Sequence, residues 1–329
     1  MKPPGSTASF LKRLLGVDSL VGNELISDQM HRYKVLEKIG EGGMGSVYKA
    51  FDQNGKEVAI KITITDQGFM RFKLETAILK LLGQHANLPE LFDWGLEKSA
   101  IKFCVMEYVE GETLDRVIRK QSDWFYQDPL LNTLDVGVGL LSALSHVHRK
   151  KVVHRDVKPH NIIINRMKRN SAGYKLVKLM DFGVAKMLEK GFLSFLHRSI
   201  RFDERTLTLP GQPIGTLGYA PREQLDNSPI DESADIFSVG VTMLEMVHGQ
   251  TFFTCSVLSE YLKLLENFVF EPFQFPRESE YVVGRLNEIL QKALAKDPHA
   301  RYNRAEKMLR ELQPLRDEIA KRRWAAARQ

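Results

Sequence analysis

The arrangement of apolar and polar positions changes partway along the chain. From Tyr33 onward, β-branched and aromatic residues form short runs that are typical of strands. The predicted strands cover 33–39, 47–51, 57–63, 91–94 and 101–107. Asn54-Gly55, between the second and third runs, is a strong signal for an antiparallel hairpin. Apolar residues at helical spacing from Phe69 to Leu82 add one helix, so this region predicts a β-rich lobe.

Beyond Gly111 the apolar positions recur with the period of helices instead. The predicted helices cover 130–149, 233–248, 256–265, 286–295 and 305–315. The fold class is therefore α+β and bilobal, with a small antiparallel β-rich lobe at 33–109 and a larger, mostly α-helical lobe at 110–314. We expect a cleft between the lobes. Residues 1–32 are interpreted as an N-terminal extension, with a short amphipathic stretch at 10–15, and residues 315–329 as a basic tail forming a solvated helix face.

Composition narrows the class of protein only modestly. The 329 residues are 43% apolar and 27% charged, which is ordinary for a globular protein with a substantial core. The net charge of +6 is small for this length, and we expect no nucleic-acid partner. Cys104 and Cys255 form neither a disulfide framework nor a metal spacing. Because no stretch reaches the ~18 to 20 apolar residues of a membrane helix, and no signal peptide is recognisable, we expect a cytoplasmic protein without a membrane span.

A glycine motif lies between the first two predicted strands. The segment from Gly40 to Val47, with Gly42 and Gly45, has the spacing G-x-G-x-x-G-x-V. A dinucleotide-binding glycine motif opens a helix, whereas this one opens a strand, and no Walker lysine follows. Backbone N–H groups of such a turn can close over phosphates because no side chain blocks their approach. By itself the motif is equally compatible with a plain structural turn.

A lysine and a glutamate are the next candidates. Alternation within Val58-Ala59-Ile60-Lys61-Ile62 places Ala59 and Lys61 on one face of the strand. A lysine among apolar residues needs an anionic partner, because burial of an unpaired charge is costly. The partner is either a ligand phosphate or Glu75, which lies among apolar positions of the following helix. An edge-strand lysine and an ordinary helix glutamate remain the alternative.

The sharpest signal lies in the second lobe. Asn161 precedes one apolar strand and Asp181 follows another, and the turn-prone stretch 169–173 lies midway between them. A hairpin centred there brings a carboxylate and an amide oxygen together, which suits Mg²⁺. Asp156 lies next to this pair without belonging to it, as a catalytic base should.

With these motifs in place, the chain resembles the protein kinase family, specifically the bacterial Hanks-type serine/threonine kinases, over about 33–314. The resemblance implies a protein-kinase-like fold and transfer of the γ-phosphate of ATP to Ser or Thr of protein substrates, with Mg²⁺ as the metal and Mn²⁺ as the alternative. Lys61 would hold the α- and β-phosphates and pair with Glu75, while Asn161 and Asp181 would bind the metal. Asp156 would accept the proton of the substrate hydroxyl. Lys158, two residues later, is typical of serine/threonine kinases.

The resemblance also implies residues around the nucleotide and in structural support. Met106 would be the gatekeeper, and Glu107 to Val109 the hinge that binds adenine. The residues expected next to the nucleotide also include Ile39, Gly40, Gly42, Gly45, Val47, Ala59 and Ile163. Those expected to support the catalytic elements are His154, Arg155, Phe182, Glu223, Asp235, Arg301 and, as a contact of Asp156 and Lys158, Thr216.

Regulation is expected in the segment from Asp181 to Glu223. The guanidinium of Arg155 would lie near this segment without a compensating anion until a phosphate is added. Thr206 and Thr208 are the favoured autophosphorylation sites, ahead of Ser194 and Ser199. The alternative is that these hydroxyls stay unmodified.

The segment that ends at Glu223 departs from the family pattern, because Arg222 occupies a position where proline is expected. This departure puts the shape of the peptide-docking groove in question. Two other classes of function remain as alternatives. A pseudokinase should lack one of the catalytic residues, and a small-molecule phosphotransferase should lack the substrate segment and Arg301. The sequence lacks none of these features.

Overall fold

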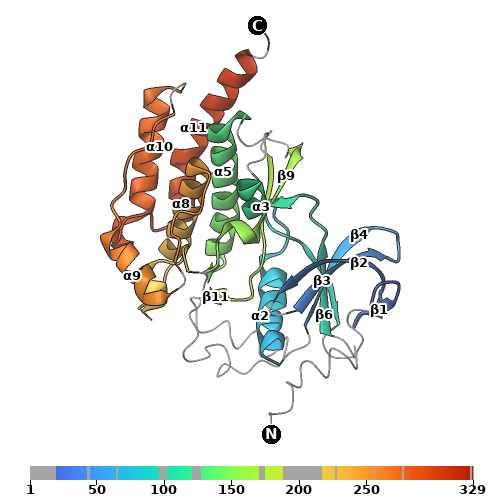
Figure 1. Cartoon of the computed structure of the whole chain (residues 1–329). Coiled ribbons are helices and arrows are strands. Elements are labelled where there is room, and N and C mark those ends of the chain that lie inside the picture. The colour runs from blue at the N-terminus through green and yellow to red at the C-terminus, as the bar shows by residue number, and fades with distance from the viewer. Residues whose placement is uncertain are drawn as a thin grey trace. The chain divides into compact units, whose positions relative to one another are not determined.

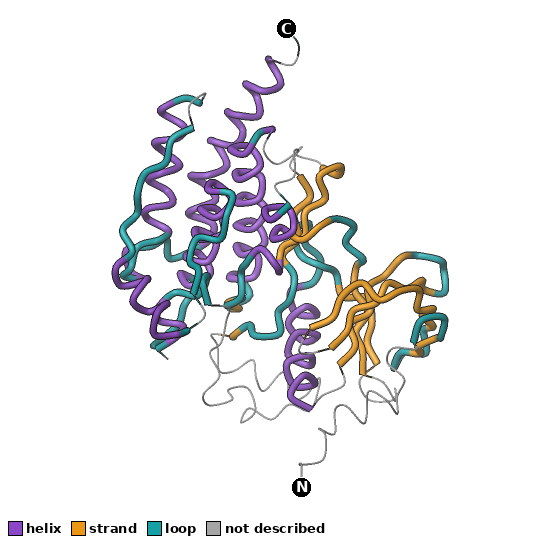
Figure 2. Tube along the Cα trace, viewed as in Figure 1, coloured by secondary structure: helices purple, strands orange, loops and turns teal. Residues whose placement is uncertain are grey.

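The computed structural model describes residues 20–42, 45–63, 66–95, 102–120, 127–169, 175–187, 217–226, 228–255, 257–275, 278–326 and 328. These residues fold as two compact units. The first contains the described residues up to Gln84 together with Pro89–Val109, and the second contains His85–Leu88 and the described residues from Glu110 onward. Most strands belong to the first unit and most helices to the second (Figures 1 and 2).

An antiparallel six-stranded sheet in the order β1-β2-β3-β4-β6-β5 forms the first unit. Its strands are β1 (Glu24–Ile26), β2 (Arg32–Gly42), β3 (Gly45–Asp52), β4 (Glu57–Thr63), β5 (Leu91–Gly95) and β6 (Lys102–Glu107). The predicted hairpin joins β3 to β4, and Gly55 adopts φ +78° in its turn. Helix α2 (Asp66–Leu82) packs against β4 and β5. Alternation along β4 places Ile60 and Ile62 in the core of this unit.

The sheet begins earlier than the sequence predicted. The sequence predicts an extension outside the lobe at 1–32, yet β1 pairs with β2, and Leu20 and Leu25 are buried in the core of the unit. The signal is weak because a three-residue strand with one buried side chain has no detectable period. Asp93, almost fully buried, holds this segment further, since it accepts hydrogen bonds from Tyr33 Oη (2.9 Å) and contacts His31 Nδ1 (2.8 Å).

Helix α5 (Pro129–Arg149) is the central element of the second unit and packs against α8 (Ser233–His248), α11 (Ala305–Ala326) and β10 (Lys175–Leu179). A Cβ at Gly137 would lie 2.7 Å from side-chain atoms of Leu312 and Met243, so a glycine here lets the helices approach closely. The other helices of this unit are α3 (Leu114–Arg119), η2 (Pro159–Asn161), α7 (Arg222–Leu225), α9 (Leu258–Asn267), α10 (Glu280–Ala293) and η4 (Pro298–Ala300). Its other strands are β7 (Glu112–Thr113), β8 (Val152–Val153), β9 (Ile162–Arg169) and β11 (Lys186–Met187).

Within the described part of the chain, α5 is the one helix with the length and hydropathy to cross a membrane. However, 83% of its most apolar window is buried inside the fold. Its apolar character is therefore that of a core helix, covered by α8 and α11.

The last helix extends past the predicted boundary at 314/315. Helix α11 continues through Pro314 to Ala326, and Ile319 is fully buried. Arg316 Nε donates to the buried carboxylate of Asp135 at 2.7 Å, which ties the helix to α5. The basic tail is therefore only partly a solvated face, because its inner side belongs to the core of the second unit.

Candidate active site

Four candidate nucleotide-binding residues of the first unit share one face of its sheet. Val47 pairs with Lys61 across β3 and β4, and Ala59 pairs with Met106 across β4 and β6. Directly opposed residues of antiparallel strands point to the same side, and Ala59 and Lys61 are two apart on one strand. The register therefore adds Val47 and Met106 to the face that alternation predicts for Ala59 and Lys61. Ile39, on β2, is 40% exposed.

Lys61 and Glu75 form the ion pair that the sequence left open. Lys61 Nζ lies 2.5 Å from Glu75 Oε2, and the side chains are 16% and 4% exposed. Because both groups are buried to this extent, removal of either one would leave the other as an uncompensated buried charge. Cys104, which pairs with Lys61 across the strands, is fully buried, and burial and the charge of Glu75 raise the pKa of its thiol. The thiol therefore stays protonated, and Glu75 is the anion that fixes the position of the lysine in this unit.

The glycine motif lies where β2 pairs with β3, and packing requires one of its glycines. Gly42 pairs with Gly45 where β2 gives way to β3. Gly45 has φ +153°, and a Cβ there would lie 1.9 Å from the carbonyl oxygen of Ile62. Only glycine allows this close approach of β3 to β4. Gly40, opposite Val47, has no such clash, so its glycine is not required by packing in the unit.

In the second unit, β9 and β10 form the predicted hairpin and bring its candidate metal ligands together. Ile162 pairs with Leu179, and Met180 N donates to Asn161 O at 2.8 Å. Asn161 therefore faces Met180 rather than Asp181, one residue away from the symmetrical pairing the sequence suggested. Asp181 follows immediately and has φ +63°, an uncommon conformation for a residue with a side chain.

Asp156 is held by two neighbours in its own loop. Its Oδ2 accepts a hydrogen bond from Asn161 Nδ2 (2.8 Å) and lies 2.8 Å from Lys158 Nζ. Asn161 Nδ2 also donates to the backbone oxygen of Asp156 at 2.9 Å. Both partners of Nδ2 are acceptors, so the amide orientation is fixed and Asn161 Oδ1 takes no part in either bond. Asp156, Lys158 and Asn161 thus form one hydrogen-bonded cluster.

Asp235 on α8 supports this loop through hydrogen bonds, as expected. Its fully buried carboxylate accepts hydrogen bonds from the backbone N–H groups of His154 and Arg155, both at 2.8 Å, and from His148 Nε2 at 2.9 Å. Burial alone would raise the pKa of Asp235, but these donors outweigh it and hold the pKa below its ordinary value. His148 was not singled out in the sequence, because its position near the end of an apolar helix resembles any core residue.

His154 links the loop to the end of β10. Its Nε2 lies 3.0 Å from the carbonyl oxygen of Met180, and its Nδ1 accepts from Asp156 N at 3.3 Å. A carbonyl can only accept, so Nε2 carries the proton and one tautomer satisfies both contacts. The ring also meets Phe182 edge-on at 4.6 Å. His154 and Phe182 therefore hold together the two segments that bear Asp156 and Asp181.

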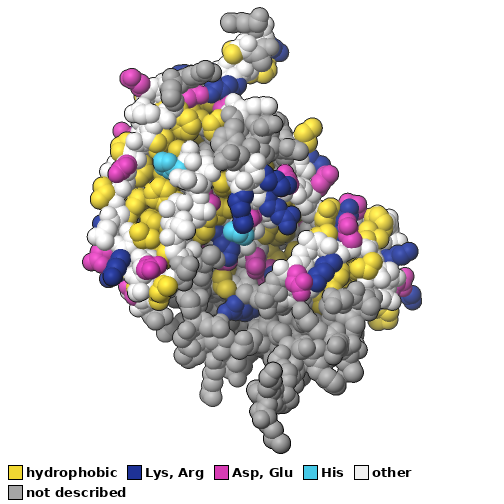
Figure 3. Space-filling view, in the orientation of Figure 1, with side chains coloured by type: hydrophobic (Ala, Val, Ile, Leu, Met, Phe, Trp, Pro, Cys, Tyr) yellow, Lys and Arg dark blue, Asp and Glu magenta, His cyan; other side chains and the backbone are white. Residues whose placement is uncertain are grey.

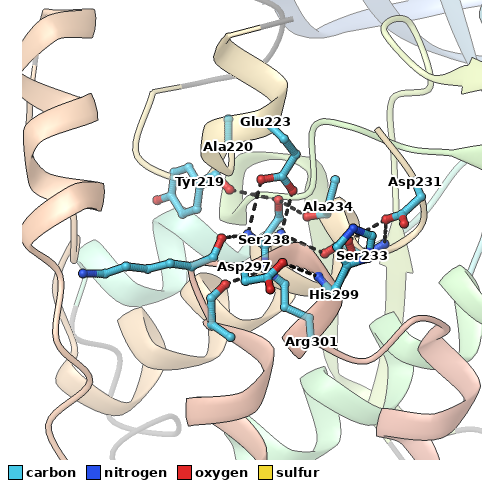
Figure 4. A network of polar contacts seen from close by, with 12 residues as sticks. Tyr219, Ala220, Glu223, Asp231, Ser233, Ala234, Ser238, Asp297, His299 and Arg301 are labelled. Carbon is cyan, nitrogen blue, oxygen red and sulfur yellow. Dashed lines mark hydrogen bonds and ion pairs between the residues drawn. The ribbon is translucent and has the colours of Figure 1, made fainter. Parts of the chain in front are cut away.

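The expected pair of Glu223 and Arg301 is present and buried (Figure 4). Two guanidinium nitrogens of Arg301 lie 2.6 and 3.3 Å from the two carboxylate oxygens of Glu223. Arg301 also donates to the carbonyl oxygens of Ala295 and Lys296. Arg222 begins α7 with its side chain 57% exposed, so the departure from proline points into solvent and leaves this pair intact.

Three of the predicted residues lie outside the described part of the chain. They are Thr216, expected near Asp156, and the candidate phosphorylation sites Thr206 and Thr208. The secondary candidates Ser194 and Ser199 also lie there. Arg155, which is described, has φ +68°, and its Nε is buried without a hydrogen-bond partner among the described residues. Burial lowers the pKa of this guanidinium, although the charge of Asp235 opposes the shift.

The described residues contain no group of three or more His, Cys, Asp or Glu side chains arranged as a metal site. Asn161 and Asp181 nevertheless offer an amide oxygen and a carboxylate at adjoining strand ends. Such a hard-oxygen pair fits a divalent ion that keeps waters and phosphate oxygens as its remaining ligands.

Comparison with known proteins identifies the family of the chain. The family model described as "Protein kinase domain" matches residues 33–312. The chain belongs to the protein kinase family. The kinase domain is 34% identical over 284 residues to the serine/threonine-protein kinase PrkC of Bacillus subtilis, covering 84% of this chain and 39% of that protein. It is 28% identical over 292 residues to the serine/threonine-protein kinase PknB of Mycobacterium leprae, covering 85% and 42% respectively.

A probable serine/threonine-protein kinase of Streptomyces coelicolor is 30% identical over 292 residues, covering 84% of this chain and 39% of that protein. The chain thus spans about two fifths of the length of the curated relatives it matches. The bilobal kinase fold accounts for the β-rich and the helical unit. Protein kinases are ATP-binding transferases that use a divalent metal.

Proposed function

We propose that this kinase domain transfers the γ-phosphate of ATP to serine and threonine hydroxyls of protein substrates. The observation that carries the proposal is the cluster in the second unit. Asp156 is held by Lys158 and Asn161, and Asp181 lies one residue beyond the backbone contact of Asn161. A base beside two hard-oxygen ligands is the arrangement that in-line phosphoryl transfer requires.

Each residue has a distinct role in this proposal. Lys61, positioned by Glu75, binds the α- and β-phosphates, and Asn161 and Asp181 hold the metal, for which Mg²⁺ is the natural choice and Mn²⁺ also fits oxygen ligands. When bound, the metal neutralises charge on the phosphates. Asp156 orients the attacking hydroxyl and accepts its proton.

Lys158 completes the positioning at the reacting group. Its ammonium lies beside Asp156 Oδ2, where it can offset negative charge on the transferring phosphoryl group. Because Asn161 Nδ2 holds the same oxygen, the carboxylate is oriented before substrate arrives. Catalysis then depends mainly on how the loop positions these groups before the reaction.

The experiment that tests the activity follows label from γ-labelled ATP into a mixture of protein substrates. Asp156→Ala and Lys61→Met are compared with Asp226→Ala and Lys263→Met, which change exposed residues of the same types. We expect the first pair to lose transfer by at least about 10²-fold, the lower end for a general base, and the second pair to retain it. Near-normal transfer by Asp156→Ala would reject the assignment.

We also propose activation by autophosphorylation at Thr206 or Thr208. Arg155 supports this because its Nε is buried without a hydrogen-bond partner among the described residues and because it lies directly before Asp156. A phosphate can pair bidentately with such a guanidinium and offset its burial. Mass spectrometry after incubation with ATP and Mg²⁺ tests this. Full activity of an unmodified protein, or of Thr206→Ala with Thr208→Ala, would contradict it.

A further inference from the structure

The solvent-facing residues of helix α3 and its C-cap are all basic. Leu114, Asp115, Val117 and Ile118 are buried, whereas Arg116, Arg119 and Lys120 are exposed. Figure 3 shows Lys and Arg side chains gathered beside a histidine on the face where α3 lies in Figure 1. None of these three cations belongs to the catalytic assignment above.

Arg119 connects this basic surface to the catalytic loop. Its Nη2 lies 2.6 Å from Asp115 Oδ2 and 2.7 Å from Nε2 of His160. His160 belongs to η2, which packs against α3, begins directly after Lys158 and ends at Asn161. Arg119 therefore contacts the same loop that carries Asp156, the residue proposed to receive the substrate hydroxyl.

The chemistry of Arg119 suits an anionic side chain. A guanidinium has five N–H donors in a plane, and both contacts above use Nη2 alone. The side chain is 66% exposed, so its outer edge is accessible to a carboxylate or phosphate. Asp115 pairs with Arg119, and Glu112 lies 2.7 Å from Lys120. These two acids balance two of the three cations, and the exposed Arg116 leaves the surface positive.

We propose that Arg119, supported by Arg116 and Lys120, selects protein substrates that carry an anionic residue, acidic or phosphorylated, close to the target serine or threonine. The inference rests on the proposed kinase function and adds a substrate class to it. His160 serves as the positioning contact that fixes Arg119 against the catalytic loop.

The test uses peptides with one serine and neutral flanks in which a single Glu, phosphoserine or Lys is moved through successive positions. We expect kcat/KM at low salt to favour Glu over Lys at one or more positions by about two- to fivefold, as for an exposed ion pair. Phosphoserine should give a larger preference, because its pairing with arginine is bidentate. Added NaCl should reduce both preferences.

Three variants locate the effect. Arg119→Glu should abolish or invert the preference, and Arg119→Lys should keep part of it. Arg310→Glu should change nothing, since Arg310 is an equally exposed arginine in an (i, i+4) pair, with Glu306 on α11. Thermal melting shows whether each variant folds. If Arg119→Glu does not fold, the peptide preference of Arg119→Lys is compared with that of the wild type instead.

A binding measurement separates this inference from the proposed activity. Anisotropy of the same labelled peptides is recorded on Asp156→Asn protein, where transfer plays no part. Tighter binding of Glu and phosphoserine peptides that depends on Arg119 supports the inference even if wild-type protein transfers no phosphate. Equal binding of Glu, Lys and neutral peptides, or a preference that Arg119→Glu leaves unchanged, overturns it whether or not transfer is observed.

Discussion

Replacement of Asp235 by asparagine tests how the catalytic loop is supported. The carboxylate is fully buried and accepts from three donors at 2.8 to 2.9 Å: His148 Nε2 and the backbone N–H groups of His154 and Arg155. An asparagine amide must turn its NH₂ toward at least one of them. A buried donor without an acceptor costs about 1–3 kcal/mol, and a hydrogen bond to a charged group contributes about 1.5–3 kcal/mol. We therefore expect Asp235→Asn to lower the free energy of unfolding by about 3–5 kcal/mol.

Urea denaturation measures this loss, with Asp226→Asn as the matched control. Asp226 is 42% exposed and lies 3.8 Å from Arg222, so its replacement should cost less than about 1 kcal/mol. Transfer of phosphate should also fall in Asp235→Asn, because the backbone on either side of Arg155 loses its anchor.

The pH dependence follows from the lowered pKa of Asp235. A carboxyl group with a depressed pKa in the folded state contributes stability above its unfolded value of 3.8, and that stability is lost as the pH falls through the folded pKa. The difference between wild type and Asp235→Asn should therefore be largest near neutral pH and shrink below about pH 4. A difference below about 1 kcal/mol at neutral pH, or one that grows on acidification, would refute the reasoning.

Three further predictions concern other parts of the structure. Arg301→Met should lower the unfolding free energy by about 3–5 kcal/mol because it leaves Glu223 buried and unpaired. The double variant with Glu223→Leu should recover part of this loss. An unchanged unfolding free energy in Arg301→Met would contradict the pairing. Gly45→Ala should destabilise the protein by about 1–3 kcal/mol and raise the KM for ATP, because its Cβ meets the Ile62 carbonyl, whereas unchanged melting would contradict the close approach. Burial and nearby cations lower the pKa of His85 to about 4, so its contribution to stability is present above the unfolded pKa of 6.5 and declines as the pH falls toward 4. His85→Gln should therefore reduce the loss of unfolding free energy between pH 6.5 and 4, measured by urea denaturation. An equal loss in wild type and variant would contradict this prediction.

The sequence was most informative where a long period or a complete motif was present. Strand Glu57–Thr63 and helix Ser233–His248 have the predicted bounds, because alternation and helical spacing persist over several turns or pairs. The need of a buried lysine for an anion predicted Glu75 as one of two possible partners of Lys61, and the resemblance to protein kinases implied the pair Glu223–Arg301.

Short or locally irregular features were not predictable in the same way. Strand β1 is only three residues long and α3 only six, so neither repeats its period often enough to be recognised in the sequence. Helix α11 continues past Pro314 because Arg316 and Ile319 pack beyond it, and this tertiary support outweighs the break that proline predicts. The positive φ values of Arg155 and Asp181 are set by their surroundings and leave no trace in the composition.

The most direct test of the central claim is a structure of the protein with Mg²⁺ and a non-hydrolysable ATP analogue. The account predicts that Lys61 Nζ contacts the α- and β-phosphates, that Asn161 and Asp181 bind the metal through oxygen, and that Asp156 lies within reach of the γ-phosphate without ligating the metal. A metal held by other residues, or a triphosphate that contacts neither Lys61 nor Asp181, would contradict it.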